Sequence, residues 1–127
     1  MQDSNFYKNK KILIIGGAGA VGSTLTHKLT DLGASVIVLD NLSSGYTWLL
    51  PNNSNMMFVN GDICSDIDLK RVFAEKPDIV FHLAAFFANQ NSVDYPEKDL
   101  KTNGLGTLKV YEYASLCGVE RIVYASS

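Results

Sequence analysis

The chain has 127 residues, of which 46% are hydrophobic and 19% are charged. These values are typical of one globular domain with its own core, and they argue against a disordered, fibrous or disulfide-rich chain. The formal net charge of −2 leaves no basic excess for a nucleic-acid backbone, so we expect no nucleic-acid partner.

The cysteines and the N-terminus indicate a cytoplasmic protein. Cys64 and Cys117 lie far apart and form no CxxC or Cys/His pattern, which disfavours a zinc site and a disulfide framework. The first nine residues are polar, and no run approaches the ~18 apolar residues that a membrane span needs. We therefore expect neither a secretion signal nor a membrane partner.

Apolar runs alternate with helix-like segments along the chain. The first run is β-branched and continuous, as in a buried parallel strand. The segment after it has apolar residues at helical spacing, Ser65 with Asp68 marks a second helix start, and that helix should stop before Pro77. The predicted strands are Lys11–Ile15, Ser35–Leu39, Met56–Val59, Asp78–Leu83 and Arg121–Ala125, and helices are predicted over Ala20–Asp31, after Ser65 and over Leu100–Leu116.

Strands separated by helical crossovers predict βαβ units. Right-handed crossovers place helices on both faces of a parallel sheet. We therefore predict an α/β, Rossmann-type doubly wound sheet of about five strands in the order 3-2-1-4-5. Residues 1–127 would form one such domain, truncated after the fifth strand.

A glycine-rich turn follows the first predicted strand. Gly16, Gly19 and Gly22 are three residues apart, and Gly17 also creates a G-x-G-x-x-G pattern, so spacing alone does not choose between two Rossmann variants. Free N–H groups in the first turn of the next helix would favour a pyrophosphate. A tight turn without a ligand is the alternative.

Asp40 ends the second predicted strand, where a carboxylate can accept hydrogen bonds from the adenosine ribose. It would also repel a 2′-phosphate, and no Arg or Lys lies between Asp40 and Met57. This pattern predicts NAD as the cofactor, preferred over NADP. The alternative is that Asp40 caps a turn with Asn41.

Six segments, GGAGAVGS, DNLSSG, GDI, FHLAA, TNGLGT and RIVYASS, resemble the extended short-chain dehydrogenase/reductase family in order and spacing. The resemblance is to its NAD-dependent nucleotide-sugar epimerases and dehydratases, in particular those like UDP-glucose 4-epimerase. It runs from about Lys10 to Ser127. Two departures, Ile15 before the glycines and Ala20-Val21 within the loop, should preserve binding.

The resemblance implies roles for residues after each strand. The glycine turn, with Ala20 and Val21, would hold the pyrophosphate, and Asp40 with Asn41 the ribose. The implied cofactor-binding residues are Gly16, Gly19, Ala20, Val21, Gly22, Asp40, Asn41, Asp62 and Ile63 beside the adenine, Leu83, Ala84 and Ala85 along the cofactor, and Asn103, which supports the active site. Ser127 aligns with the catalytic serine, and no metal is implied.

The family's catalytic tyrosine and lysine lie on a helix after the fifth strand. The one Tyr-x-x-x-Lys present, Tyr7 with Lys11, precedes the first strand and is treated as chance. We therefore interpret the chain as the NAD-binding, N-terminal portion of such an enzyme, inactive alone, whose full-length form would also bind a nucleotide sugar. The alternative is a stand-alone dinucleotide-binding or interaction module.

Truncation would also leave apolar surface uncovered. The residues concerned lie around Ile122, Tyr124 and the Leu100–Leu116 helix. Self-association through this surface is the expected consequence.

Overall fold

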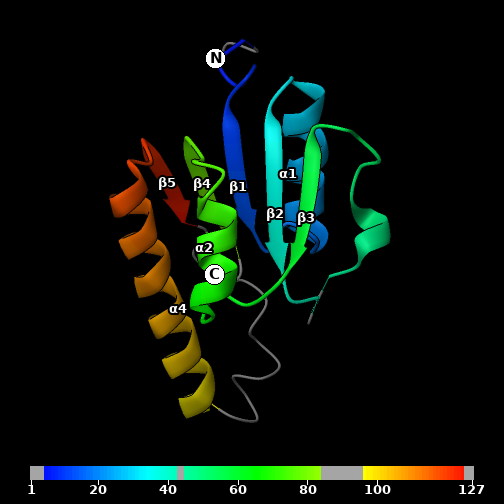
Figure 1. Cartoon of the computed structure of the whole chain (residues 1–127). Coiled ribbons are helices and arrows are strands. Elements are labelled where there is room, and N and C mark those ends of the chain that lie inside the picture. The colour runs from blue at the N-terminus through cyan, green and yellow to red at the C-terminus, as the bar shows by residue number, and fades with distance from the viewer. Residues whose placement is uncertain (1–4, 43–44, 84–95, 125–127) are drawn as a thin grey trace.

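A computed structural model describes residues 5–42, 45–83 and 96–124, with the side chains of 96–103 left out. Five parallel strands form one sheet: β1 (Lys11–Ile15), β2 (Ser35–Asp40), β3 (Met56–Asn60), β4 (Ile79–His82) and β5 (Arg121–Tyr124). Their order is β3-β2-β1-β4-β5, as the sequence predicted (Figure 1).

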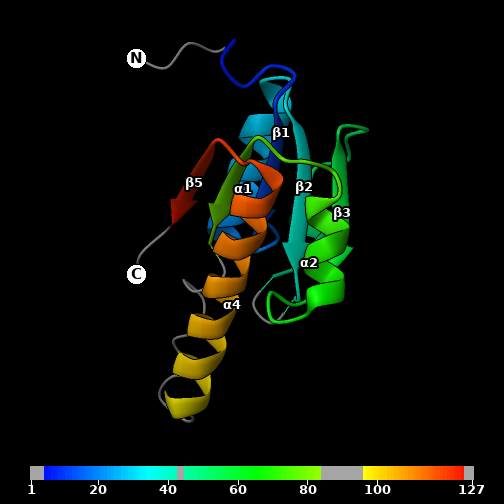
Figure 2. The ribbon, with the colours of Figure 1, turned by 60° about the vertical axis from the view of Figure 1, so that its left-hand side comes forward.

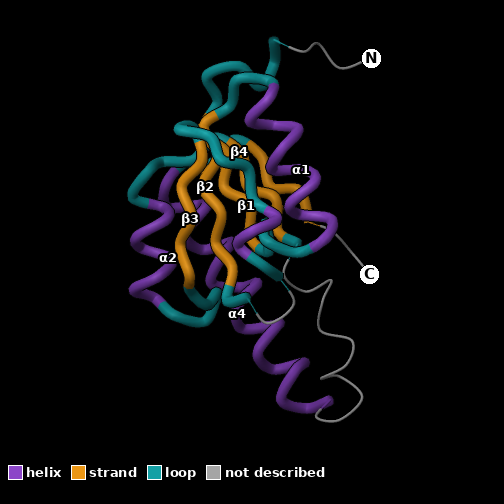
Figure 3. Tube along the Cα trace, turned by 90° about the vertical axis from the view of Figure 1, so that its right-hand side faces the viewer, coloured by secondary structure: helices purple, strands orange, loops and turns teal. Residues whose placement is uncertain are grey.

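The helices form a layer on each face of the sheet. α1 (Ala20–Asp31) covers one face, and α2 (Asp66–Phe73) with α4 (Pro96–Cys117) covers the other (Figure 3). A short 3-10 helix, η1 (Thr47–Leu49), lies between β2 and β3. The start of α4 runs past the carboxyl edge of the sheet (Figure 2). β1 and α1 have the predicted bounds, and the ends of the other predicted elements differ from the observed ones by at most four residues, as expected where terminal turns fray.

β1 shows why its sequence is apolar at every position. Ile12 and Ile14 lie in the core cluster beneath α1, whereas Leu13 and Ile15 lie in the cluster beneath α2 and α4. Successive side chains of a strand point to opposite faces, so a strand covered on both sides needs apolar residues throughout. β1 pairs with β2 on one side and with β4 on the other, which makes it the central strand.

The parallel arrangement brings the described site segments that follow β1, β2, β3 and β4 to one edge. Because the strands point the same way, the segments after β1, β2, β3 and β4 leave the sheet at its carboxyl edge. The strand order reverses between β1 and β4, and ligands of open α/β sheets bind at such a switch point.

Candidate functional site

The glycine turn after β1 has the shape that its spacing predicted. Gly16 adopts a left-handed φ of 86°, and its N–H donates to the Leu39 carbonyl oxygen at 2.8 Å. Gly22 is buried against this turn, where an added Cβ would lie 2.7 Å from the Gly17 Cα. Glycine at position 22 therefore allows α1 to approach the end of β1 this closely.

The first turn of α1 presents backbone donors beside this turn. Gly19 is the N-cap residue, and the Ser23 N–H donates to its carbonyl oxygen at 2.8 Å. The N–H groups of Ala20, Val21 and Gly22 precede that bond, and helix geometry gives them no intrahelical acceptor. Together with the positive end of the helix dipole they can hold an anion such as a phosphate.

Asp40 joins the glycine turn to the segment after β2. Its side chain is 9% exposed; Oδ2 accepts a hydrogen bond from the Ala18 N–H at 2.9 Å, and Oδ1 accepts one from the Leu42 N–H at 2.7 Å. The turn-capping alternative is therefore present, with Leu42 in place of the expected partner Asn41. Each carboxylate oxygen can accept a second hydrogen bond, so the role of Asp40 and exposed Asn41 toward a ribose stays a prediction.

Asp62 and Ile63 follow β3 as expected, and α2 fixes their backbone. The Asp62 N–H donates to Asp68 Oδ2 at 2.9 Å, and Asp62 Oδ1 accepts from the Cys64 N–H at 2.9 Å. The Ile63 side chain is 8% exposed and belongs to the core cluster under α2 and α4. An adenine at this position would meet an edge of the core.

Other predicted site residues lie at or beyond the described segments. Leu83 directly follows β4, is buried, and donates its N–H to the Ile15 carbonyl oxygen at 2.8 Å. Asn103 lies within α4, but its side chain is outside the described residues. Ala84, Ala85 and Ser127 also lie outside them. Their expected roles remain predictions.

His82 has the environment of a structural residue. The ring is fully buried at the end of β4, its Nε2 lies 3.1 Å from Thr107 Oγ1 of α4, and it packs edge-on against Tyr124. Burial lowers the pKa of His82 to about 4. The imidazole is therefore neutral at pH 7.

Gly45 is a contact residue for which no sequence pattern predicts a role of its own. It belongs to the DNLSSG segment, and an added Cβ would lie 2.7 Å from the carbonyl carbon and oxygen of Ala18. The only sequence signal was its place in that segment. No local pattern relates it to Ala18, because the contact joins segments that the sheet brings together.

Two competing chemistries lack support in the described part of the chain. No group of three or more His, Cys, Asp or Glu there could hold a metal ion. Burial, with the nearby Asp62 charge, raises the pKa of the Cys64 thiol, which is the opposite of what an activated nucleophile needs.

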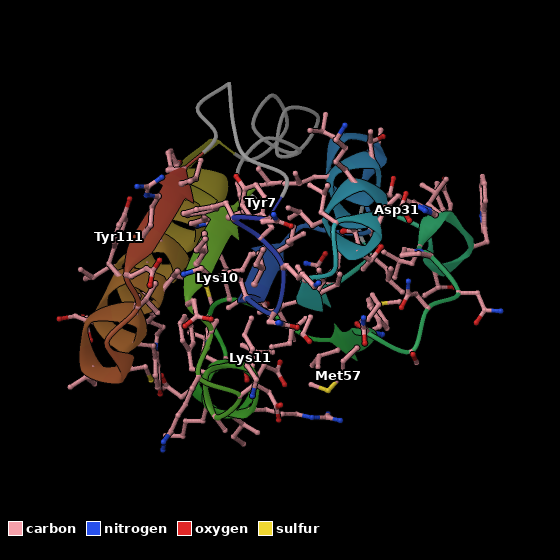
Figure 4. All side chains as sticks on the ribbon, turned by 90° about the horizontal axis from the view of Figure 1, so that it is seen from above. Tyr7, Lys10, Lys11, Asp31, Met57 and Tyr111 are labelled. Carbon is pink, nitrogen blue, oxygen red and sulfur yellow. The ribbon has the colours of Figure 1, made fainter. Side chains whose placement is uncertain are left out.

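The Tyr7 and Lys11 pair lies away from the glycine turn. Figure 4 views the molecule from the end at which β1 begins, and both residues lie there. The glycine turn follows the other end of β1, so the pair has no place in the candidate site.

Comparison with known proteins decides the family. The model of the NAD-dependent epimerase/dehydratase family matches residues 12–127, nearly the whole chain. The chain belongs to this family. Family membership agrees with the parallel sheet, its strand order and the glycine turn before α1.

Individual relatives are similar over nearly all of this chain. A UDP-glucose 4-epimerase of Mycolicibacterium smegmatis is 42% identical over 121 residues, 92% of this chain and 38% of the relative. The structure of an epimerase from Methanothermobacter thermautotrophicus superposes with a TM-score of 0.93 at 64% identity, covering 98% of this chain and 37% of the other. A Thermus thermophilus UDP-glucose 4-epimerase in complex with NAD gives 0.83 at 36% identity, covering 92% and 37%. The chain thus spans little more than a third of these relatives.

No helix in the described segments is both long enough and apolar enough to cross a membrane.

Proposed function

We propose that the chain binds NAD at the carboxyl edge of the sheet. The pyrophosphate would lie on the first-turn N–H groups of Ala20, Val21 and Gly22, beside Gly16 and Gly19. Asp40 and Asn41 would hold the adenosine ribose, and Asp62 with Ile63 would border the adenine. Leu83, Ala84 and Ala85 would line the cofactor toward its nicotinamide end, with Asn103 supporting that end.

One observation carries this proposal: the carboxylate of Asp40 reaches across to the glycine turn. Asp40 Oδ2 lies 2.9 Å from the Ala18 nitrogen, one residue before the N-cap of α1. An acceptor for ribose hydroxyls and a set of donors for a pyrophosphate are therefore adjacent. The close approach of Gly22 to Gly17 leaves no side chain between them.

The cofactor would supply hydride transfer to and from a sugar carbon. We propose that the chain serves in a nucleotide-sugar epimerase or dehydratase, with Ser127 orienting the reacting oxygen. The support is the family match and relatives that include UDP-glucose 4-epimerases and a CDP-paratose 2-epimerase. A cytoplasmic location, where NAD and nucleotide sugars are both present, is part of this proposal.

We also propose that NAD is preferred over NADP. A 2′-phosphate would meet the Asp40 carboxylate in a partly buried setting, where like charges repel more strongly than in water. No Arg or Lys between Asp40 and Met57 is available to neutralise it.

Calorimetry with NAD and NADP tests both the binding of NAD and its preference over NADP. We expect NAD to bind the unaltered chain with about tenfold higher affinity than NADP. Asp40→Asn should reduce this ratio, because it removes the charge. The variant also loses one hydrogen-bond acceptor toward the loop, which should weaken the binding of both NAD and NADP. The ratio of the two affinities therefore isolates the effect of the charge. Asp31→Asn, which removes an exposed carboxylate at the far end of α1, is the matched control.

The binding of NAD and the preference for NAD over NADP are contradicted by different results. Undetectable binding of NAD contradicts the cofactor proposal. Equal affinity for NAD and NADP in the unaltered chain contradicts only the role of Asp40 in cofactor preference.

A further inference from the structure

The segment after β2 returns to the glycine turn and packs against its backbone. The Tyr46 N–H donates to the Ala18 carbonyl oxygen at 3.0 Å. An added Cβ at Gly45 would lie 2.7 Å from the Ala18 carbonyl carbon and oxygen, and 3.0 Å from the Gly19 nitrogen. These are backbone atoms, so no side-chain rotation could relieve the overlap.

Space, and not backbone conformation, accounts for glycine at this position. Among the described residues, the glycines with positive φ are Gly16, Gly33 and Gly118, and no positive φ is found at Gly45. An alanine could adopt the backbone conformation of Gly45, but its methyl group would press on the Ala18–Gly19 peptide. An alanine substitution therefore tests the contact alone.

The Asp40 carboxylate binds the same residue of the glycine turn, Ala18, through its backbone N–H. Asp40 Oδ2 accepts from the Ala18 N–H, so the two backbone polar groups of Ala18 bind Asp40 and Tyr46. The other oxygen accepts from the N–H of Leu42, whose φ of 63° is rare for a branched residue. One carboxylate thus stabilises the glycine turn and the sharp bend that leads the chain back toward it.

The position of this peptide affects the donors in α1. Ala18 is fully buried, and the next residue, Gly19, is the N-cap. A shift of the Ala18–Gly19 peptide would move the N–H groups of Ala20, Val21 and Gly22 away from their present positions. Displacement of a positioning group by about 1 Å can lower a binding affinity or a reaction rate many-fold.

We propose that Gly45 is a positioning residue of the dinucleotide site. By allowing backbone contact with Ala18 and Gly19, it fixes the first-turn donors of α1 where a pyrophosphate would bind. This inference rests on the proposed function and adds to it a residue outside the glycine fingerprint, supplied by the segment after β2.

The test compares Gly45→Ala with Gly104→Ala. An added Cβ at Gly104 meets no atom of the described residues within 4 Å, so this control makes the same chemical change without a described contact. In the ligand-free chain, Gly45→Ala should shift the amide NMR resonances of Gly19, Ala20 and Val21, and Gly104→Ala should leave them unchanged. Affinity for NAD and for ADP-ribose, measured by calorimetry, should fall about tenfold in Gly45→Ala alone.

A comparison of ligands separates positioning from general damage. Adenosine lacks the pyrophosphate, so Gly45→Ala should lower the affinity for adenosine much less than the affinity for ADP-ribose. Equal losses for the two ligands, unshifted first-turn amides, or an ADP-ribose affinity within about twofold of the unaltered chain would each overturn the inference. If the unaltered chain does not bind NAD, the proposed function fails, and the amide shifts still decide whether Gly45 positions the turn.

Hydrogen exchange supplies a measurement that needs no variant, in case Gly45→Ala does not fold. The Tyr46 amide, bonded to the Ala18 oxygen, should exchange far more slowly than an unprotected amide in the unaltered chain. Exchange at the unprotected rate would show that the contact does not persist, and the inference would be wrong.

Discussion

The imidazole of His82 is fully buried, and its one hydrogen bond within the described part of the chain is to Thr107. Its Nδ1 has no partner within the described residues. A buried ring with one unsatisfied nitrogen strongly disfavours the charged form, and the pKa of about 4 follows from that desolvation. The stability of the chain should therefore depend on the protonation of this one residue.

We predict that His82 makes the chain less stable in mild acid. Between pH 6.5 and pH 4 the unfolded imidazole takes up a proton while the folded one stays neutral, so the free energy of unfolding falls as pH falls through this window. The pKa difference corresponds to roughly 3 kcal/mol in total. Urea unfolding from pH 7 to pH 4 measures the slope.

His82→Gln keeps a polar side chain near Thr107 but cannot titrate, so it should flatten this slope even where it lowers stability at pH 7. His27→Gln, a change at the exposed histidine, is the control. An unchanged slope in His82→Gln would contradict the assignment.

At the scale of elements, α2 and α4 are joined by polar and apolar contacts. Lys109 Nζ lies 3.0 Å from both carboxylate oxygens of Asp66, and the Tyr113 hydroxyl donates to the same carboxylate. These bonds lower the pKa of Asp66 and raise that of Lys109. The ion pair is solvent-exposed and contributes little to stability, so packing decides how closely the two helices approach.

Ser65 is the N-cap of α2, as predicted, with its hydroxyl accepting from the Asp68 N–H at 3.3 Å. A capping box would pair the Asp68 carboxylate with the Ser65 N–H, but that N–H donates to the Asp62 carbonyl oxygen. The carboxylate of Asp68 accepts from the Asp62 N–H, three residues before the cap. α2 thereby holds the turn that carries a predicted adenine-binding residue.

Two glycines of α4 allow a matched prediction about helix packing. An added Cβ at Gly106 would lie 2.5 Å from Ile63 Cγ1, whereas at Gly104 it would meet no atom of the described part of the chain within 4 Å. Gly106→Ala should lower the free energy of unfolding by about 1–3 kcal/mol through overpacking. Gly104→Ala should raise it by up to about 1 kcal/mol, because alanine has the higher helix propensity. Chemical denaturation of both variants measures this.

Adding Ile63→Val to Gly106→Ala should restore part of the loss, since valine lacks the Cδ1 methyl group. If Gly106→Ala were as stable as Gly104→Ala, the close approach of α4 to Ile63 would be wrong.

For the whole molecule, the main apolar exposure lies on α4 and β5. Large side chains there are exposed by 39% to 83%, and they are Leu105, Leu108, Tyr111, Leu116, Val123 and Tyr124. The sequence predicted uncovered apolar surface around Ile122, Tyr124 and this helix; Tyr124 and the α4 residues are exposed, whereas Ile122 is half-buried and packs against the core. Exposed apolar side chains gathered on neighbouring elements of a small domain favour association.

We predict that the chain self-associates through this face at high concentration. Sedimentation velocity over a wide concentration range should show a rising mean mass, and Leu108→Glu should reduce it by placing a charge on the face. Ile67→Glu, at an 80% exposed position on α2, is the control. A compact monomer at every concentration would contradict the prediction.

The sequence alone determined the strand order, because alternating apolar runs and helical crossovers leave few ways to build a parallel sheet. It also located the glycine turn, the start of α1 and the cap of α2, since each depends on residues close together in the chain. Strand and helix ends were less exact: Asp40 continues β2 by one residue, and α4 begins at Pro96, four residues before its predicted start.

Only the tertiary structure decided which distant segments touch. Asp40 contacts Ala18, Gly45 packs on the Ala18–Gly19 peptide, and Ile63 lies against Gly106. None of these pairs has a sequence signal, because the contacts form only after parallel pairing brings the carboxyl ends of β1, β2 and β3 to one edge. Local patterns fix the elements, which need only neighbouring residues, whereas the shape of the site depends on backbone approaches that packing alone establishes.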